Sequence, residues 1–337
     1  MKGALVITAA FLFLCLGSLA QAITIDTVPV GDPGNQPDTR YETPGYGSVG
    51  YNYNIGKYEV TAAQYTAFLN AVAATDNYGL YNTQMDTAVY SSGCNIKRTG
   101  SSGSYVYSVA SDWANRPVNY VSYWDSCRFT NWLQNGQPTG LQPATTEGGV
   151  YTLDGYNGTD GHDIQRNANW KWAVTSEDEW YKAAYYKGGG TTAGYWDYPT
   201  SSDSAPSNVL GNPTDPGNNA TYYNNGYTIG SPYYRTEVGA HENSESPYST
   251  FDQGGNVWEW NEAIAYQDVT YAYRGCRGGS FDESDYALQA SGRAYSGPTD
   301  EGYGIGFRVS EVVPEPSSLM ILAGGVGMIL GIRRRKA

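Results

Sequence analysis

The stretch Gly255-Asn256-Val257-Trp258-Glu259-Trp260 decides the fold of this chain of 337 residues. Its tryptophans, Trp258 and Trp260, flank Glu259 with a period of two, which is the spacing of side chains on one face of a β-strand. The spacing predicts that both rings face one side of the strand and that the carboxylate faces the other side.

Two further blocks downstream place an arginine beside glycine. They are Arg277-Gly278-Gly279-Ser280-Phe281 and Gly306-Phe307-Arg308. An arginine in a Gly-rich strand is usually buried with a carboxylate or with carbonyl groups. We therefore expect Arg277, Arg293 and Arg308 to pair with acidic residues near the core, where removal of one partner costs about 3 to 5 kcal/mol.

Three helices are predicted from their starts, because each begins with a capping box that precedes apolar residues at helical spacing. The first runs from Thr61 to about Ala74, the second from Ser122 to about Leu133, and the third from Ser176 to about Tyr186.

Short strands and long loops are predicted between and after the helices. Gly50 to Tyr58 and Trp170 to Val174 are strand-like, and Val150 to Leu153 is predicted as one arm of a hairpin. Gly188 to Thr250 has almost no periodicity. A loop of this length is unusual in a compact domain, so it is either functional or held by something other than a hydrophobic core, for which a bound cation is the obvious candidate.

Composition limits the partners of the chain. Without its sorting segments the chain has about 15 basic and 32 acidic residues, a net charge of about −17. Nucleic acid is excluded as a partner, because phosphate binding needs clustered positive charge. The 32 tyrosines, against 7 phenylalanines, suit recognition surfaces, although most single tyrosines pack loops onto a core.

The N-terminus is typical of a secretory signal peptide over residues 1–22. Lys2 supplies the positive region, Ala4 to Leu19 the apolar region, and Ala20-Gln21-Ala22 the cleavage site. This predicts export. Of the remaining cysteines, Cys94, Cys127 and Cys276, one pair is able to form a disulfide in an oxidising compartment, and the sequence leaves all three pairings open.

The C-terminus, residues 313–337, resembles a PEP-CTERM sorting signal. Pro314-Glu315-Pro316 precedes an apolar stretch at 319–332 and the basic run Arg333-Arg334-Arg335-Lys336. Fourteen residues make a helix of roughly 21 Å, shorter than the ~30 Å hydrocarbon core, so a temporary membrane anchor is expected. The resemblance implies a sorting protease or transpeptidase as partner and a location in the cell envelope or outside the cell. An ordinary tail anchor is the alternative.

Six blocks occur in a fixed order over residues 24–311 and resemble the formylglycine-generating enzyme family, also called the sulfatase-modifying factor domain. They begin at Ile55, Arg116, Ser176, Gly255, Arg277 and Gly306. The resemblance implies one domain, residues 23–312, with an α+β fold related to C-type lectins. It also implies a loop-rich structure with few short helices and strands.

Structural calcium is a further implication of the resemblance. One site is expected at Asn256, Val257 and Glu259, and a second at Asn208 and Val209. Calcium takes six to eight oxygen ligands, which loops are able to supply. A plain loop and ion-pair role for Asn256 and Glu259 is an equal alternative.

The family's chemistry uses two cysteines after the Gly-Gly-Ser block to bind copper, for which soft thiolates are selective. Here Glu283 and Leu288 stand at those positions, so no copper and no catalytic residue are expected. Cys276 is expected to be buried or disulfide-bonded.

These observations predict an exported binding or structural module without oxidase chemistry. Its ligand, a glycan or a protein, would meet the 188–250 loop and the 282–305 region. A metal-dependent oxidoreductase and a calcium-dependent lectin are the alternatives. The pocket of interest is formed by the residues after the Gly-Gly pair: Ser280, Phe281, Asp282, Glu283 and Asp285.

Overall fold

The computed structural model describes residues 22–211 and 217–313. Most of the predicted signal peptide, the tripeptide Pro314-Glu315-Pro316 and the predicted anchor at 319–332 lie outside the described residues. Within the described ranges, no helix is both long enough and apolar enough to cross a membrane.

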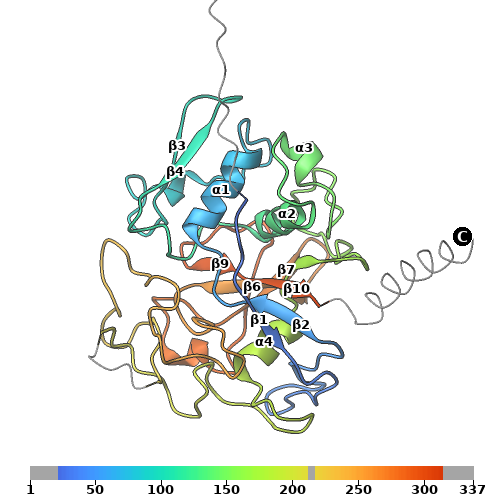
Figure 1. Ribbon diagram of the computed structural model, residues 1–337, viewed down its shortest axis with the longest axis vertical. Helices are drawn as coiled ribbons and strands as arrows, with labels where there is room; N and C mark the ends of the chain where they lie inside the picture. The colour runs from blue at the N-terminus through green and yellow to red at the C-terminus, as the bar shows by residue number, and fades with distance from the viewer. Residues whose placement is uncertain (1–21, 212–216, 314–337) are drawn as a thin grey trace, which may run out of the picture.

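Two four-stranded sheets form the centre of the molecule (Figure 1). The first is antiparallel, in the order β1 (Thr27–Val30), β2 (Tyr53–Gly56), β10 (Val309–Val312) and β5 (Trp172–Val174). The second has the order β8 (Ala294–Ser296), β7 (Ala272–Arg277), β6 (Trp258–Gln267) and β9 (Ile305–Phe307), with β6 and β9 parallel. A separate hairpin joins β3 (Ile96–Thr99) and β4 (Val106–Val109).

Helices cover the strands from two sides. In Figure 1, α1 (Ala62–Val72), α2 (Tyr123–Gln134) and α3 (Gln142–Thr145) lie above the strands, and α4 (Glu177–Tyr185) lies below them. Two short 3₁₀ helices, η1 (Thr83–Met85) and η2 (Asp285–Leu288), complete the described elements.

The three predicted helix starts are confirmed. In each case the cap hydroxyl accepts a hydrogen bond from the N–H three residues later, and the side chain there accepts one from the cap N–H. The pairs are Thr61 with Gln64, Ser122 with Asp125, and Ser176 with Glu179. The reciprocal bonds satisfy backbone donors that the first helical turn leaves free.

Two strand predictions are confirmed, since β2 and β5 lie inside the predicted segments, but the predicted hairpin arm at 150–153 is wrong. In this segment a side chain, and not a neighbouring strand, forms hydrogen bonds with the backbone. Asn131 of α2 accepts a hydrogen bond from the Tyr151 N–H at 2.8 Å and donates to the Tyr151 carbonyl at 2.9 Å. The backbone polar groups of the segment are thus satisfied without a ladder.

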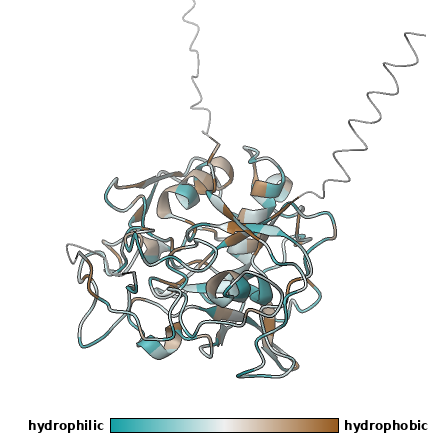
Figure 2. Ribbon diagram, turned by 60° about the horizontal axis from the view of Figure 1, so that its bottom comes forward, coloured by the Kyte–Doolittle hydropathy of each residue, from teal (hydrophilic) through white to brown (hydrophobic). Residues whose placement is uncertain are grey.

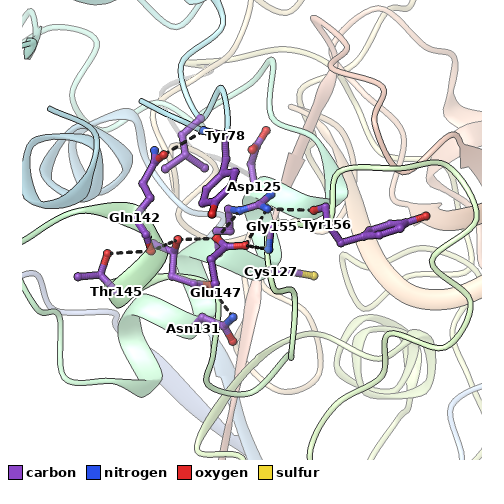
Figure 3. A network of polar contacts seen from close by, with 12 residues as sticks. Tyr78, Asp125, Cys127, Asn131, Gln142, Thr145, Glu147, Gly155 and Tyr156 are labelled. Carbon is purple, nitrogen blue, oxygen red and sulfur yellow. Dashed lines mark hydrogen bonds and ion pairs between the residues drawn. The ribbon is translucent and has the colours of Figure 1, made fainter. Parts of the chain in front are cut away.

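A buried ion pair holds the same segment against α2 (Figure 3). Arg128 Nε donates to Glu147 Oε1 at 2.8 Å, and Nη2 donates to Oε2 at 3.0 Å and to the Tyr156 carbonyl at 2.9 Å. The Gly155 N–H donates to Glu147 Oε2 at 2.8 Å. This polar network replaces the predicted hairpin pairing.

The hydrophobic core is aromatic and centres on α1 and α2. Phe129 lies 5.3 Å from both Phe68 and Phe307, centroid to centroid, in edge-to-face contacts, and Trp132 lies 5.2 Å from Phe68. Trp260 packs into the same core, and the Glu259 carboxylate points away from it, as the period of two predicts. Hydrophobic residues also occur along the loops in Figure 2.

One buried ion pair connects both sheets with α4. Arg308, which is fully buried, donates to Glu259 through Nε at 3.0 Å and Nη2 at 2.8 Å. It also donates to the carbonyls of Gly56 and Phe251, each at 2.8 Å. Trp180 of α4 donates its ring N–H to Glu259 at 2.7 Å. The predicted pairing of Arg308 is confirmed.

An acidic residue without a hydrogen bond lies beside this pair. Glu59 is 1% exposed, and its carboxylate is 3.9 Å from Arg308 Nη2, yet neither oxygen has a hydrogen-bond partner among the described residues. Burial, and then the nearby Asp252, raise the pKa of Glu59 well above its usual range. Burial also raises the pKa of Asp252 to about 6. Three carboxyl groups, those of Glu259, Glu59 and Asp252, therefore lie near the Arg308 guanidinium, which balances the charge of only one of them.

The other two predicted arginine pairings are also confirmed. Arg277 and Arg293 share Glu177 in the first turn of α4. Arg277 Nε donates to Oε1 at 2.9 Å, and Arg293 Nη2 donates to Oε2 at 2.8 Å. The carboxylate also suits the positive N-terminal end of the helix.

The segment between α4 and β6 contains no helix or strand in its described residues, in agreement with the prediction for 188–250. It fills the lower part of Figure 1. Arg235, fully buried, donates to the carbonyls of Ser92 at 2.9 Å and Gly93 at 3.0 Å. Arg116 in turn donates to the Arg235 carbonyl. Arginine–carbonyl bonds thus hold this long loop to the rest of the domain.

We predict that Glu259→Gln lowers the free energy of unfolding by about 3 to 5 kcal/mol, because it leaves Arg308 buried without its ionised partner. Lys171→Ala is the control, since Lys171 lies 3.9 Å from Glu311 in an exposed pair and its loss should change stability by about 0.5 kcal/mol or less. Urea unfolding measures both values. Equal losses in the two variants would contradict a central role for the buried pair.

Candidate functional site

Two glycine turns build the floor of the candidate site. Gly278 has φ +97°, and a Cβ there would lie 2.7 Å from the Gln253 carbonyl oxygen. Gly255 has φ +87°, and a Cβ there would lie 2.0 Å from the Thr221 carbonyl oxygen. Both positions require glycine, because any side chain would clash with backbone and strain the left-handed conformation.

The two turns are hydrogen-bonded into one unit. The Gly255 N–H donates to the Gly278 carbonyl at 2.9 Å, and the Phe281 N–H donates to the Asn256 carbonyl at 3.0 Å. The unit ties the end of β7 to the start of β6. It fixes where Ser280 and Phe281 leave the second sheet.

Asp282 accepts two hydroxyl hydrogen bonds beside this unit. Ser280 Oγ donates to Oδ1 at 2.6 Å, and the Tyr303 hydroxyl donates to Oδ2 at 2.7 Å. The bond to Asp282, together with burial, raises the pKa of Tyr303 to about 12. Ser280 is thus oriented by a carboxylate, and among the described residues that line the hollow with it there is no histidine to activate it as a nucleophile.

A hollow of about 190 Å³ opens above these residues. Its lining combines ring, hydroxyl and carboxylate groups: Trp258, Ser280, Asp282, Glu283, Gly302, Tyr303, Gly304 and Ile305. Three of the predicted pocket residues, Ser280, Asp282 and Glu283, therefore come together.

Tyrosines surround Phe281 at the edge of the hollow, and we call Tyr223, Tyr227, Tyr234 and Tyr303 the aromatic rim. Phe281 itself is 3% exposed, and its ring centroid lies 5.5 to 6.1 Å from those of Tyr234, Tyr303 and Tyr227. Tyr223, Tyr227 and Tyr303 are 42 to 45% exposed. The rim joins the 188–250 loop to the 282–305 region, the two segments predicted to meet a ligand.

Asp285 and Leu288, one of the two expected cysteine positions, lie away from the hollow, whereas Glu283, the other position, lines it. Asp285 begins η2 and accepts a bond from the Tyr198 hydroxyl at 3.3 Å, away from the lining of the hollow. Leu288 is fully buried in an apolar cluster with Tyr198. Glu283 is exposed at the hollow.

The three cysteines of the described chain are free and buried, so the disulfide that the sequence allowed is not formed among them. Burial raises the pKa of the Cys94, Cys127 and Cys276 thiols. The thiolate is the nucleophilic and metal-binding form, so these thiols are unreactive at neutral pH. None of them lines the hollow.

The Asn256 set of the predicted calcium ligands does not gather its oxygens. Glu259 is engaged by Arg308 and Trp180. Asn256 Oδ1 instead accepts bonds from the N–H and hydroxyl of Thr236 at 3.0 and 3.1 Å. These residues do not fit a calcium ion in this arrangement.

The Asn208 set fits a hard cation better. The carboxamide of Asn208 lies between two carbonyl oxygens, those of Gly226 at 2.9 Å and Tyr222 at 3.3 Å, and donates to both. If the Asn208 amide turned by a half turn, its oxygen would take the place of its nitrogen beside the two carbonyl oxygens. Three oxygens would then lie together, and calcium prefers oxygen ligands. Val209 follows on an exposed stretch.

A half-buried acidic group, Glu301, lies in the loop that carries Tyr303. Burial, and then the neighbouring Asp125, raise the pKa of Glu301 to about 8, although Asn82 donates a hydrogen bond to it. Burial raises the pKa of Asp125 to about 6 against the bonds from Ser122. Both carboxyl groups lie next to the start of α2.

Sequence reasoning missed Tyr303, Glu301 and Arg235. Tyr303 stands between Gly302 and Gly304, and an aromatic between two glycines is a weak local signal for a presented ring. Nothing local marks Glu301 or Arg235, because their partners are distant in sequence.

The comparisons with known proteins agree with this architecture. The model of the sulfatase-modifying factor enzyme 1-like domain matches residues 27–312, and that of the PEP-CTERM protein-sorting motif matches residues 312–336. The search of curated proteins gave no match.

Two solved structures share the fold. A crystal structure of CarF is 20% identical with a TM-score of 0.53, covering 87% of this chain and 100% of that one. Variable protein 1 of Treponema denticola is 18% identical with a TM-score of 0.52, covering 88% and 98%. At these identities the likeness is one of fold alone, and it supports an α+β, C-type-lectin-like fold.

We predict that the stability of the protein falls as pH rises from about 4.3 to 8, because native Glu301 keeps its proton to about pH 8 and an unfolded glutamate loses it near 4.3. One such group contributes a slope of up to about 1.4 kcal/mol per pH unit. In Glu301→Gln this part of the slope should vanish, whereas exposed Glu245→Gln should keep it. Urea unfolding at several pH values tests this, and an unchanged slope in Glu301→Gln would refute it.

Proposed function

Since this chain belongs to the family of sulfatase-modifying factor enzyme 1-like domains and carries a PEP-CTERM sorting motif, we propose that it is an exported binding or structural module. The sorting motif indicates export to the cell envelope or the extracellular space, with processing by an exosortase-type sorting enzyme. The module itself would be residues 23–312, between the predicted signal peptide and the sorting segment.

The lining of the hollow is the observation that carries this proposal. It offers tryptophan and tyrosine rings, a hydroxyl and two carboxylates, but no thiol. Copper(I) chemistry needs soft sulfur ligands, and Glu283 and Leu288 supply none. The exposed rings of the aromatic rim are instead suited to contact with a ligand, because tyrosine combines contact area, low entropy cost and a polar tip.

The rival function, an oxidoreductase with a hard metal, would need Asp282, Glu283 and Asp285 around one ion. The Asp285 carboxylate faces Tyr198, and Asp282 is occupied by two hydroxyls. In the described part of the chain no three His, Cys, Asp or Glu side chains are grouped to hold a metal ion. The observations therefore favour binding over this chemistry.

The test of the proposed function uses the full-length protein on glycan and peptide arrays. We expect Tyr227→Ala with Tyr303→Ala to weaken binding at least tenfold, and Tyr286→Ala to leave it unchanged, because Tyr286 is 73% exposed but outside the rim. Oxygen uptake with a cysteine-containing peptide and copper(I) is measured in parallel. Conversion of the peptide thiol to an aldehyde would overturn the proposal.

We also propose that calcium binds at Asn208 with the carbonyls of Tyr222 and Gly226, holding the long loop and thus the aromatic rim. Metal analysis should find calcium in the wild type and less in Asn208→Ala. Calcium at 100 times its dissociation constant should stabilise the wild type by about 2.7 kcal/mol. Asn224→Ala, an exposed change in the same loop, is the control. Equal calcium content in all three proteins would refute this site.

A further inference from the structure

Four tyrosines form a second aromatic surface, on the hairpin of β6 and β7 and the adjoining strand β8. We call Tyr266, Tyr271, Tyr273 and Tyr295 the tyrosine platform. Tyr266 and Tyr295 are 51% and 55% exposed, Tyr271 is 36% exposed, and Tyr273 is half-buried. Exposed large rings that gather in one place are uncommon on a monomer and mark interaction sites.

Strand register explains why the four rings share one face. Tyr266 is paired with Tyr273 across β6 and β7, and Tyr295 of β8 is paired with Gly275, two residues beyond Tyr273. Tyr271 precedes Tyr273 by two residues. Because paired residues and residues two apart point to the same side, all four side chains leave the same face of the sheet.

An irregularity in β6 turns this face toward solvent. The register shifts between Ile264 and Tyr266, so that Ile264 is paired with Arg274 but Tyr266 with Tyr273. Arg274 and Tyr273 are neighbours in β7 and face opposite sides. The guanidinium of Arg274 packs 4.5 Å from the centre of the Tyr123 ring in the core, so the tyrosine platform lies on the outer face. A bulge of this kind re-aims a side chain.

The rings contact one another closely and keep their polar groups free. Ring centroids are 5.1 Å apart for Tyr271 and Tyr273, 5.6 Å for Tyr266 and Tyr273, and 5.9 Å for Tyr266 and Tyr295. Two of these contacts are near-parallel, with interplanar angles of 23° and 26°. None of the four hydroxyl groups has a hydrogen-bond partner in the described ranges. The platform is a preformed apolar surface with unused donors and acceptors.

We propose that the tyrosine platform is a binding site for a neutral polysaccharide. A sugar ring has a face of C–H groups that packs on an aromatic ring, and hydroxyl groups at its edge that bond to polar groups. Tyrosine meets both needs at low entropy cost. The rings form a cluster, since Tyr273 also lies 5.6 Å from Tyr295, and a polymer that crosses it would meet several rings, as bases do on aromatic platforms in single-strand binding proteins.

Charge and composition argue against other occupants. The exposed charged side chains near the platform, Asp268 and Asp300, are acidic, and the nearest basic one, Arg293, is paired with Glu177, so an anionic polymer or lipid surface would be repelled. Only Val269 adds an exposed aliphatic group. Tyrosine is also enriched in protein interfaces, so a second copy of the chain is the rival occupant that the chromatography below tests.

This site goes beyond the proposed function, because it is distant from the aromatic rim. The hollow begins at Trp258, at one end of β6. The β7 partners of Glu259 and Tyr266, which are Arg277 and Tyr273, lie four residues apart, roughly 13 Å at about 3.3 Å per residue. The platform contains no calcium ligand, so its binding should not require the ion. Binding at the platform and binding at the aromatic rim are therefore independent, and an experiment is able to disprove one without the other.

The experiment is affinity electrophoresis of the full-length protein in a detergent without a sugar head group. Gels contain laminarin or hydroxyethyl cellulose as neutral polysaccharides, or alginate as an anionic one. We expect retardation by at least one neutral polymer, none by alginate, and the same result in EDTA. Tyr266→Ala with Tyr295→Ala should weaken binding at least tenfold, and the Phe variants of the same positions should keep part of it.

Tyr286→Ala is the control, because Tyr286 is exposed but belongs neither to the platform nor to the aromatic rim, and this variant should bind the polysaccharide like the wild type. Lack of retardation by every neutral polymer, or undiminished binding by the double Ala variant, would overturn the inference. Size-exclusion chromatography provides a second readout. A dimer that the double variant abolishes would also overturn it, since a second copy of the chain would then cover the platform.

Discussion

The buried pair of Arg308 and Glu259 is the interaction on which the rest of the fold depends. Two charges removed from water are stable only when their own donors and acceptors are satisfied. Here the guanidinium reaches β2, β6 and the end of the long loop, and the carboxylate reaches α4. In this loop-rich protein the ion pair therefore connects elements that a continuous apolar layer connects in other proteins. It aligns two small sheets that share no strand.

The candidate site follows from the same arrangement. Glu259 stands three residues after Asn256, so the pair that fixes β6 also fixes the turn at Gly255 and, through it, the turn at Gly278. Backbone hydrogen bonds therefore position the hollow and the aromatic rim. A scaffold of this kind is suited to presenting a surface to a ligand. The sheet surface farther along β6 is held by strand pairing and by hydrogen bonds to Thr159 and Gly161, and none of these contacts involves the long loop.

Several features were predictable because their causes are local. Capping boxes, the period of two around Trp258 and the arginines beside glycine each leave a short-range pattern, and the structure follows it. The hairpin expected at Val150 fails because Asn131, distant in sequence, satisfies the backbone there. Long-range contacts likewise form the aromatic rim, the surroundings of Glu301 and the tyrosine platform. A local sequence pattern cannot predict contacts between residues that are distant in the chain.

The arginines that hold the long loop bind main-chain oxygens, and this has an evolutionary consequence. Arg235 recognises the carbonyls of Ser92 and Gly93, groups that every residue type possesses. Mutations in the outward-facing side chains of the loop leave such anchors untouched. Exposed positions of the segment between α4 and β6 are thus able to accept other side chains without loss of these anchors.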